Sequence, residues 1–263
     1  MDYEKTLAQL LDWAVNTSNV RAVVLTRSAA AQTQHPLSDR DLELHVRDTD
    51  ALAADDSWWN ALGEVLAVER LRNGHDQPTR LIYCVGGKLD FTLIDVQEPR
   101  GTYDRPFTVL LDKDDDASSF TLQTLAPRIP DQGMFDECCN WASAAALMVA
   151  KAIVRDEPWS EMTRDADLKF ALLRMIEWDH QLRHGSARDV RYLGTRMREW
   201  MDPGVRHRLE MCALTFGRNN REALVETFEL FEELAVGVAR DAGLRPFDLR
   251  RVRREVHSIV GSR

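Results

Sequence analysis

Apolar residues recur with two different periods along this chain. The first half mixes helical spacing with short apolar runs of strand length, whereas only helical spacing is present from about residue 134 onwards. The pair Gly86-Gly87 separates two of the short runs and is typical of a tight hairpin turn. The pattern therefore predicts an α+β fold, in which a mixed β-sheet with flanking helices is followed by an all-α helical bundle.

The first half is predicted to alternate between the two kinds of element. The predicted helices are 3–16, a short one from Ser28, and 49–62; the predicted strands are 20–26, 39–47, 64–71, 80–85, 88–96 and 108–111. On the strand 39–47, the apolar residues Leu42, Leu44 and Val46 share one face. Since side chains alternate along a strand, the polar residues Asp39, Asp41, Glu43 and His45 share the other face.

The second half reads as a series of helices interrupted by proline and glycine. The predicted helices are 135–155, 166–184, 190–201, 203–216, 221–242 and 249–260, with breaks at Pro158, Gly185, Pro203, Gly217 and Gly243–Pro246. We therefore expect two domains, 1–130 and 131–263, that meet near residues 127–133.

Three aspartates carry the candidate chemistry. Asp39 and Asp41 point to the same face of one predicted strand, and Asp90 lies just past the hairpin turn on another. Paired carboxylates suit Mg²⁺, which prefers oxygen ligands. Asp90 can complete a two-metal site or accept the proton of an attacking hydroxyl. The alternatives are a solvated aspartate pair at the start of a strand and, for Asp90, a cap on a turn amide.

Taken in order along the chain, these residues resemble the aminoglycoside 6-adenylyltransferases of the nucleotidyltransferase superfamily. The resemblance rests on the strand leading to Ser28, the Asp39-x-Asp41 strand, and the segments 55–58, 62–63, 89–94, 109–114, 135–140, Lys151, 172–178 and 228–231. It implies a nucleotidyltransferase-type sheet that binds Mg²⁺ and ATP. It also implies transfer of AMP to a hydroxyl of a streptomycin-like aminoglycoside, with release of pyrophosphate and resistance to the antibiotic.

The same resemblance implies roles for individual residues. Asp39, Asp41 and Asp90 would be the catalytic residues and metal ligands. Ser28, Arg27 and Lys151 would bind the nucleotide, Asp136 and Glu137 would hold a cationic acceptor, and Trp178 is either a sugar platform or a core residue. Arg188 and Arg191 stand where relatives carry a basic cluster; a solvated helix face is favoured for them over a phosphate contact. The resemblance does not separate a base from a ligand role for Asp90.

Two departures from the family pattern leave alternatives open. Arg27-Ser28-Ala29 stands where relatives carry Gly-Ser-Arg, and Trp141-Ala142-Ser143 stands where they carry Glu-Phe-Trp. Glycine permits a tight turn and a close approach of the backbone to phosphates, so Arg27 can point away, bind a phosphate itself or obstruct the pocket. The alternatives are a nucleotidyltransferase with a different acceptor and a catalytically impaired nucleotide-binding homologue.

Composition narrows the class of partner. The net charge is −9 and the pI is about 5.3, which argues against a general nucleic-acid binder and suits a polycationic acceptor. The residues Met1–Lys5 lack a basic-then-apolar signal pattern, and no apolar run approaches 18 residues. We therefore expect a cytoplasmic protein without a membrane span, a monomer or weak homodimer, with four reduced cysteines.

Overall fold

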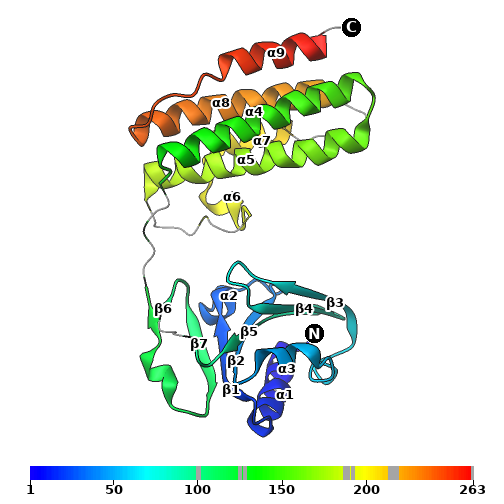
Figure 1. Ribbon diagram of the computed structural model, residues 1–263, viewed down its shortest axis with the longest axis vertical. Helices are drawn as coiled ribbons and strands as arrows, with labels where there is room; N and C mark the ends of the chain where they lie inside the picture. Colours follow the sequence, from blue (N-terminus) through cyan, green and yellow to red (C-terminus); the bar gives the residue numbers. More distant parts are fainter. Residues whose placement is uncertain are drawn as a thin grey trace. The chain divides into compact units, whose positions relative to one another are not determined.

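Strands are confined to the first half of the chain in the computed structural model, which describes residues 1–98, 102–123, 126, 129–185, 190, 193–212 and 219–261. The chain divides into two units, Met1–Leu125 and Ala126–Arg263 (Figure 1). The first unit contains a mixed sheet, and the described residues of the second form helices and connecting segments. The α+β fold class predicted from the sequence is confirmed.

A six-stranded sheet organises the first unit. Its strands are β1 Val20–Thr26, β2 Arg40–Val46, β3 Val65–Arg72, β4 Pro78–Cys84, β5 Gly87–Asp95 and β7 Phe107–Asp112. They lie in the order β3-β4-β5-β2-β1-β7, and β2 and β5 are parallel while every other neighbouring pair is antiparallel. The parallel pair at the centre of the sheet brings the two predicted aspartate strands together.

One face of this sheet is packed against helices. The helices α1 (Tyr3–Asn16) and α3 (Thr49–Ala54) contribute Leu10 and Leu52 to a core that also contains Leu42, Leu44 and Phe91 from the strands. Burying one fully apolar side chain of this size contributes about 2 kcal/mol. Since the alternate residues of β2 point the other way, the polar residues lie on the opposite face of the sheet.

Two local predictions for the first unit were wrong, and one small sheet was not predicted. The predicted helix 49–62 ends at Ala54, because the Asp55 side chain accepts the Ser57 N–H at 2.8 Å and turns the chain out of the helix. Helix α2 (Arg27–Ala30) begins at Arg27, with Thr26 rather than Ser28 in the cap position. A small sheet of β6 (Thr102–Tyr103) and β8 (Thr121–Leu122) was not predicted, because two-residue strands leave no periodic pattern.

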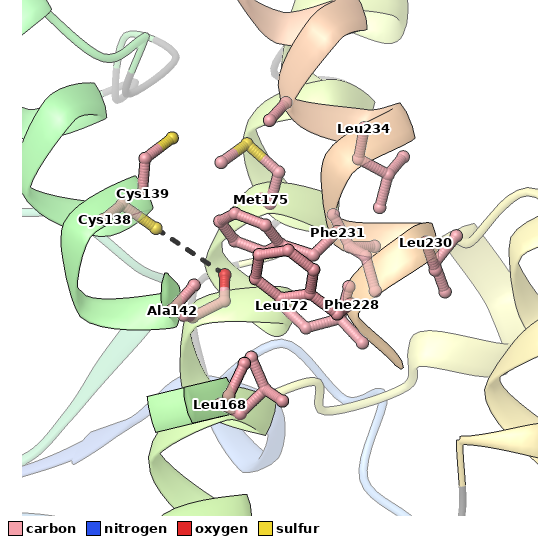
Figure 2. Packing of buried hydrophobic residues seen from close by; sticks show 14 of the residues in the cluster. Cys138, Cys139, Ala142, Leu168, Leu172, Met175, Phe228, Leu230, Phe231 and Leu234 are labelled. Atoms are coloured by element: carbon pink, nitrogen blue, oxygen red, sulfur yellow. Dashed lines mark hydrogen bonds between the residues drawn. The ribbon is translucent and has the colours of Figure 1, made fainter. Parts of the chain in front are cut away.

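The second unit is built around two long helices packed against each other. Its helices are α4 Gln132–Val154, α5 Pro158–His184, α6 Met197–Trp200, α7 Pro203–Met211, α8 Asn220–Asp241 and α9 Arg250–Gly261. Figure 2 shows how Cys138 and Ala142 of α4 meet Leu172 of α5 and Phe228 and Phe231 of α8 in one buried cluster.

Two helix predictions for this unit need correction. Helix α5 begins at Pro158 instead of 166, because proline fits the first turn of a helix, where its missing N–H costs no hydrogen bond. Within the predicted helix 190–201, α6 is the helical segment among the described residues. The predicted end of the helix 203–216 and the break at Gly217 lie outside the described residues.

Helix α4 also meets the length and composition of a membrane span, unlike any other helix in the described part of the chain. Half of its most apolar stretch is buried inside the helical unit. The core helices of soluble proteins pass the same test, so the packing in Figure 2 accounts for the apolar character of α4.

Candidate active site

Two aspartates lie side by side on the parallel strands at the centre of the sheet. Asp41 of β2 and Asp90 of β5 are direct neighbours in register, and adjacent strands are about 4.8 Å apart. The side chains are 18% and 16% exposed, so both carboxylates are largely shielded from water. The Oδ1 atom of Asp90 is buried and has no hydrogen-bond partner within the described residues. A buried carboxylate oxygen without a donor favours a bound cation.

Lys88 joins the third aspartate to this pair. Its Nζ lies 3.0 Å from Oδ2 of Asp39, just before β2, and 2.9 Å from Oδ2 of Asp90, two residues further along β5. The backbone of Lys88 is also held in place, because its N–H donates to the Tyr3 hydroxyl at 3.1 Å. A fixed ammonium therefore bridges two of the three predicted ligands.

Arg27 occupies the other side of Asp41. Its guanidinium Nη1 lies 3.0 Å from Asp41 Oδ1, and its backbone N–H donates to the carbonyl of Pro106 at 2.9 Å. Its φ angle is +61°, in the left-handed region that favours glycine. The chain thus keeps, with an arginine, the backbone conformation that suits the family's glycine. In this structure the Arg27 side chain contacts Asp41, one of the candidate catalytic residues.

Burial and neighbouring charges act in opposite directions on these groups. Burial raises the pKa of Asp41, and the Arg27 guanidinium opposes that rise. Burial likewise raises the pKa of Asp90 against the effect of the Lys88 hydrogen bond. For Lys88, burial lowers the pKa, but the hydrogen bonds to Asp90 and Asp39 outweigh burial and leave the pKa raised. The site therefore favours positive charge close to its carboxylates.

The three aspartates do not form a joint set of metal ligands in this structure. Across the residues that the structure describes, no three His, Cys, Asp or Glu side chains converge in that way. Instead, Lys88 lies between Asp39 and Asp90, and Arg27 contacts Asp41. The donor set that remains, Asp41 beside Asp90 with its unpartnered oxygen, fits one hard cation such as Mg²⁺.

The other predicted nucleotide contacts lie in separate places. Ser28 is half-buried within the first turn of α2, next to Arg27. Lys151 is exposed in the last turn of α4, in the second unit. Arg188 and Arg191 lie outside the described residues. The structure therefore brings Ser28 and Arg27 together beside the aspartates within the first unit.

The predicted acceptor residues have different environments. Asp136 accepts a hydrogen bond from Gln132 Nε2 at 2.8 Å, and Trp178 is buried in the core of the helical unit. Glu137 is exposed and lines a cavity of about 220 Å³, together with Trp141 and Phe170. Glu137 therefore lines a cavity, whereas Trp178 belongs to the core.

Sequence reasoning missed two features on the polar face of the sheet. Lys88 was overlooked, although its position two residues before Asp90 places both side chains on one face. The second feature is a polar group further along β2, in which the Tyr103 hydroxyl donates to Glu43 Oε2 at 2.7 Å and His45 Nε2 lies 3.4 Å from the same oxygen. Tyr103 belongs to one of the short strands without a sequence signal, so this contact could not be predicted.

Known proteins resemble much of this chain. Residues 1–252 match the streptomycin adenylyltransferase family. An aminoglycoside 6-adenylyltransferase of Campylobacter jejuni is 27% identical over 64% of this chain and 64% of its own length, and one of Staphylococcus aureus is 26% identical over 68% of this chain and 70% of its own length. The crystal structure of an aminoglycoside 6-adenyltransferase from Bacillus subtilis is 19% identical, with a TM-score of 0.49 and 98% of both chains covered.

The family match confirms the resemblance and, at family level, the assignment to nucleotidyltransferase enzymes. The family match spans both units, from the paired aspartates of the sheet to the C-terminal helices. The chain belongs to the streptomycin adenylyltransferase family.

Proposed function

We propose that this protein transfers AMP from ATP to a hydroxyl of an aminoglycoside-like acceptor and releases pyrophosphate. The observation that carries the proposal is the register pairing of Asp41 with Asp90, which leaves a buried, unpartnered carboxylate oxygen at the centre of the sheet in a member of this family. A streptomycin-like acceptor is proposed from the family, and antibiotic resistance would be the consequence.

The proposed reaction is a displacement at the α-phosphorus of ATP. The acceptor oxygen forms a bond to the α-phosphorus, the bond to the bridging oxygen breaks, and pyrophosphate leaves with the electron pair. Asp90 would receive the proton of the attacking hydroxyl or help to hold the cation. Asp39 and Asp41 would contribute further carboxylates to the cation site. A bound Mg²⁺ would supply neutralisation of charge on the phosphates.

The basic and hydroxyl side chains near the aspartates would position the triphosphate. Arg27 is 3.0 Å from Asp41 and is able to make a charge-assisted hydrogen bond to a phosphate oxygen instead. Ser28 follows it directly, and Lys151 of the helical unit is proposed as a further phosphate contact. Removing Arg27 should therefore raise the KM for ATP more than it lowers kcat.

The acceptor is proposed to be a small cationic molecule. The net charge of −9 raises the local concentration of cations, and the exposed Glu137 beside Asp136 supplies acidic groups for an acceptor's amines. We further propose that the protein is cytoplasmic, where ATP is available, that it acts as a monomer or weak homodimer, and that it needs neither nucleic acid nor membrane.

Pyrophosphate release tests the proposal. The full chain would be assayed with Mg·ATP and a panel of aminoglycosides including streptomycin. Release should depend on one acceptor, stop when a chelator removes the metal, and fall by about 10²- to 10⁴-fold in Asp41→Asn, since that variant keeps the size and loses the charge.

The matched control is Asp12→Asn, the same chemical change at an exposed position of α1 in the same unit. It should leave pyrophosphate release unchanged. Equal rates in Asp41→Asn and the unaltered chain would contradict the proposal, because the observation that carries it would then have no part in the reaction.

Two observations favour alternative functions. The ion pair between Arg27 and Asp41 favours a homologue that binds the nucleotide without transferring it, and this alternative predicts ATP binding without pyrophosphate release. The cavity beside Glu137 is lined by Met134, Trp141 and Phe170, which favours a less cationic acceptor with an apolar ring. Turnover with such an acceptor, and none with aminoglycosides, would select that second alternative.

A further inference from the structure

The ammonium group of Lys88 is held between two carboxylates. Its Nζ lies 3.0 Å from Asp39 and 2.9 Å from Asp90, and its side chain is 19% exposed. The backbone N–H of the same residue donates to Tyr3 of α1 at 3.1 Å. An exposed lysine usually samples many rotamers, whereas this one is fixed at both ends. Its charge lies where a metal ion shared by Asp39 and Asp90 would lie.

The charge supplied by the chain matches that of a second divalent ion. Lys88 neutralises one carboxylate group of the site and Arg27, 3.0 Å from Asp41, neutralises another. Together they bring two positive charges to the three aspartates. A divalent ion bound by Asp39 and Asp90 as well would lie close to Nζ, and like charges at such a separation repel strongly in a partly buried site.

The type of residue also fits this role. The chain has 29 arginines and only five lysines, so most of its cations are guanidinium groups. The ammonium of a lysine is a compact point charge that can lie between two separate carboxylates, whereas the planar guanidinium prefers one carboxylate in a forked contact. The lysine ammonium can therefore contact Asp39 and Asp90 at the same time.

Asp41 and Asp90 together offer a place for one ion. Asp90 Oδ1 is buried without a partner and lies beside Asp41 in the register of the sheet. We propose that this site takes one divalent cation instead of two, and that the Lys88 ammonium occupies the place of the second between Asp39 and Asp90. The inference rests on the proposed function and specifies the metal content of the same site.

Counting bound Mn²⁺ tests the inference without any turnover. Mn²⁺ would be titrated into the full chain with α,β-methylene ATP, which cannot release pyrophosphate. Electron paramagnetic resonance would report the ions bound per chain–nucleotide complex and any magnetic coupling between two neighbouring ions. The unaltered chain should bind one ion without coupling, and Lys88→Met should bind two coupled ions.

Two controls separate charge at this position from charge in general. Lys88→Arg keeps the cation and should bind one ion, and Lys5→Met removes the same charge from an exposed position of α1 and should also bind one. Circular dichroism would establish that each variant is folded. If Lys88→Met does not fold, the number of Mn²⁺ ions bound by the unaltered chain decides the outcome.

The possible failures are distinguishable. A coupled pair of Mn²⁺ ions in the unaltered chain, or a single ion in folded Lys88→Met, would overturn the inference and leave the proposed function standing. The absence of nucleotide-dependent Mn²⁺ binding in every folded protein would contradict the proposed function and the inference with it.

Discussion

At the scale of single residues, the chain places an arginine at the position of the family's glycine and a lysine between two of its candidate aspartates. Arg27 holds a left-handed φ of +61° and contacts Asp41, and Lys88 bridges Asp39 and Asp90. The candidate aspartates could be predicted from their spacing and from the family resemblance. Their partners could not, because an ion pair between residues 49 positions apart depends on which strands become neighbours.

The backbone of Arg27 provides the first prediction. A residue with a Cβ in the left-handed region costs about 1 kcal/mol relative to glycine, and the variants Arg27→Gly and Arg27→Ala both lose the ion pair with Asp41. Arg27→Gly should therefore have a free energy of unfolding about 1 kcal/mol above that of Arg27→Ala, in urea denaturation at neutral pH. An alanine variant as stable as the glycine variant would show that the left-handed backbone is absent in solution.

At the scale of elements, the sequence predicted the helices and strands with a long periodic pattern and the turn that contains two glycines. Helix α1, strand β1 and the hairpin at Gly86-Gly87 lie where periodicity and the glycine pair put them. The end of α3 was missed because a single side-chain hydrogen bond of Asp55 stops it. The start of α5 was missed because a proline is found both at the first position of a helix and just after the end of one, and Pro158 was interpreted only as a break.

The hairpin that delivers Lys88 and Asp90 gives a prediction for an element. Gly86 has a φ of +77°, and a Cβ there would lie 2.3 Å from the Met1 backbone nitrogen. Gly86→Ala should lower the free energy of unfolding by about 1–2 kcal/mol, because the left-handed strain and the clash act together. The matched control is Gly74→Ala, since a Cβ at Gly74 meets no atom within 4 Å. Equal losses in both variants, by thermal denaturation, would contradict this account of the turn.

At the scale of the whole molecule, each unit has a core of its own. Phe91 and its neighbours fill one side of the sheet, and Phe228 and Phe231 fill the centre of the helical unit (Figure 2). The change from mixed to purely helical periodicity near residue 134 predicts two domains, 1–130 and 131–263. The periodicity does not predict the cavity beside Glu137, because that cavity depends on how α4 and α5 pack.

Separate cores predict separate losses of stability. Phe231→Ala should cost about 3–5 kcal/mol in the helical unit, since it leaves a cavity in a fully buried cluster. In hydrogen exchange followed by mass spectrometry, peptides from α4, α5 and α8 should lose protection while peptides from β1 and β2 keep theirs. Phe91→Ala should give the reverse pattern. A loss spread equally over both units by either variant would show that the chain unfolds as one domain.

The most direct test of the central claim is to follow the α-phosphate. Full-length protein would be incubated with Mg·ATP labelled at the α-phosphorus and with each aminoglycoside in turn, and the acceptor would be recovered and its mass determined. We predict that the label and the mass of an adenylyl group appear together on one acceptor, and that Asp90→Asn lowers the rate by about 10²-fold or more. A folded protein that leaves every acceptor unlabelled would contradict the account.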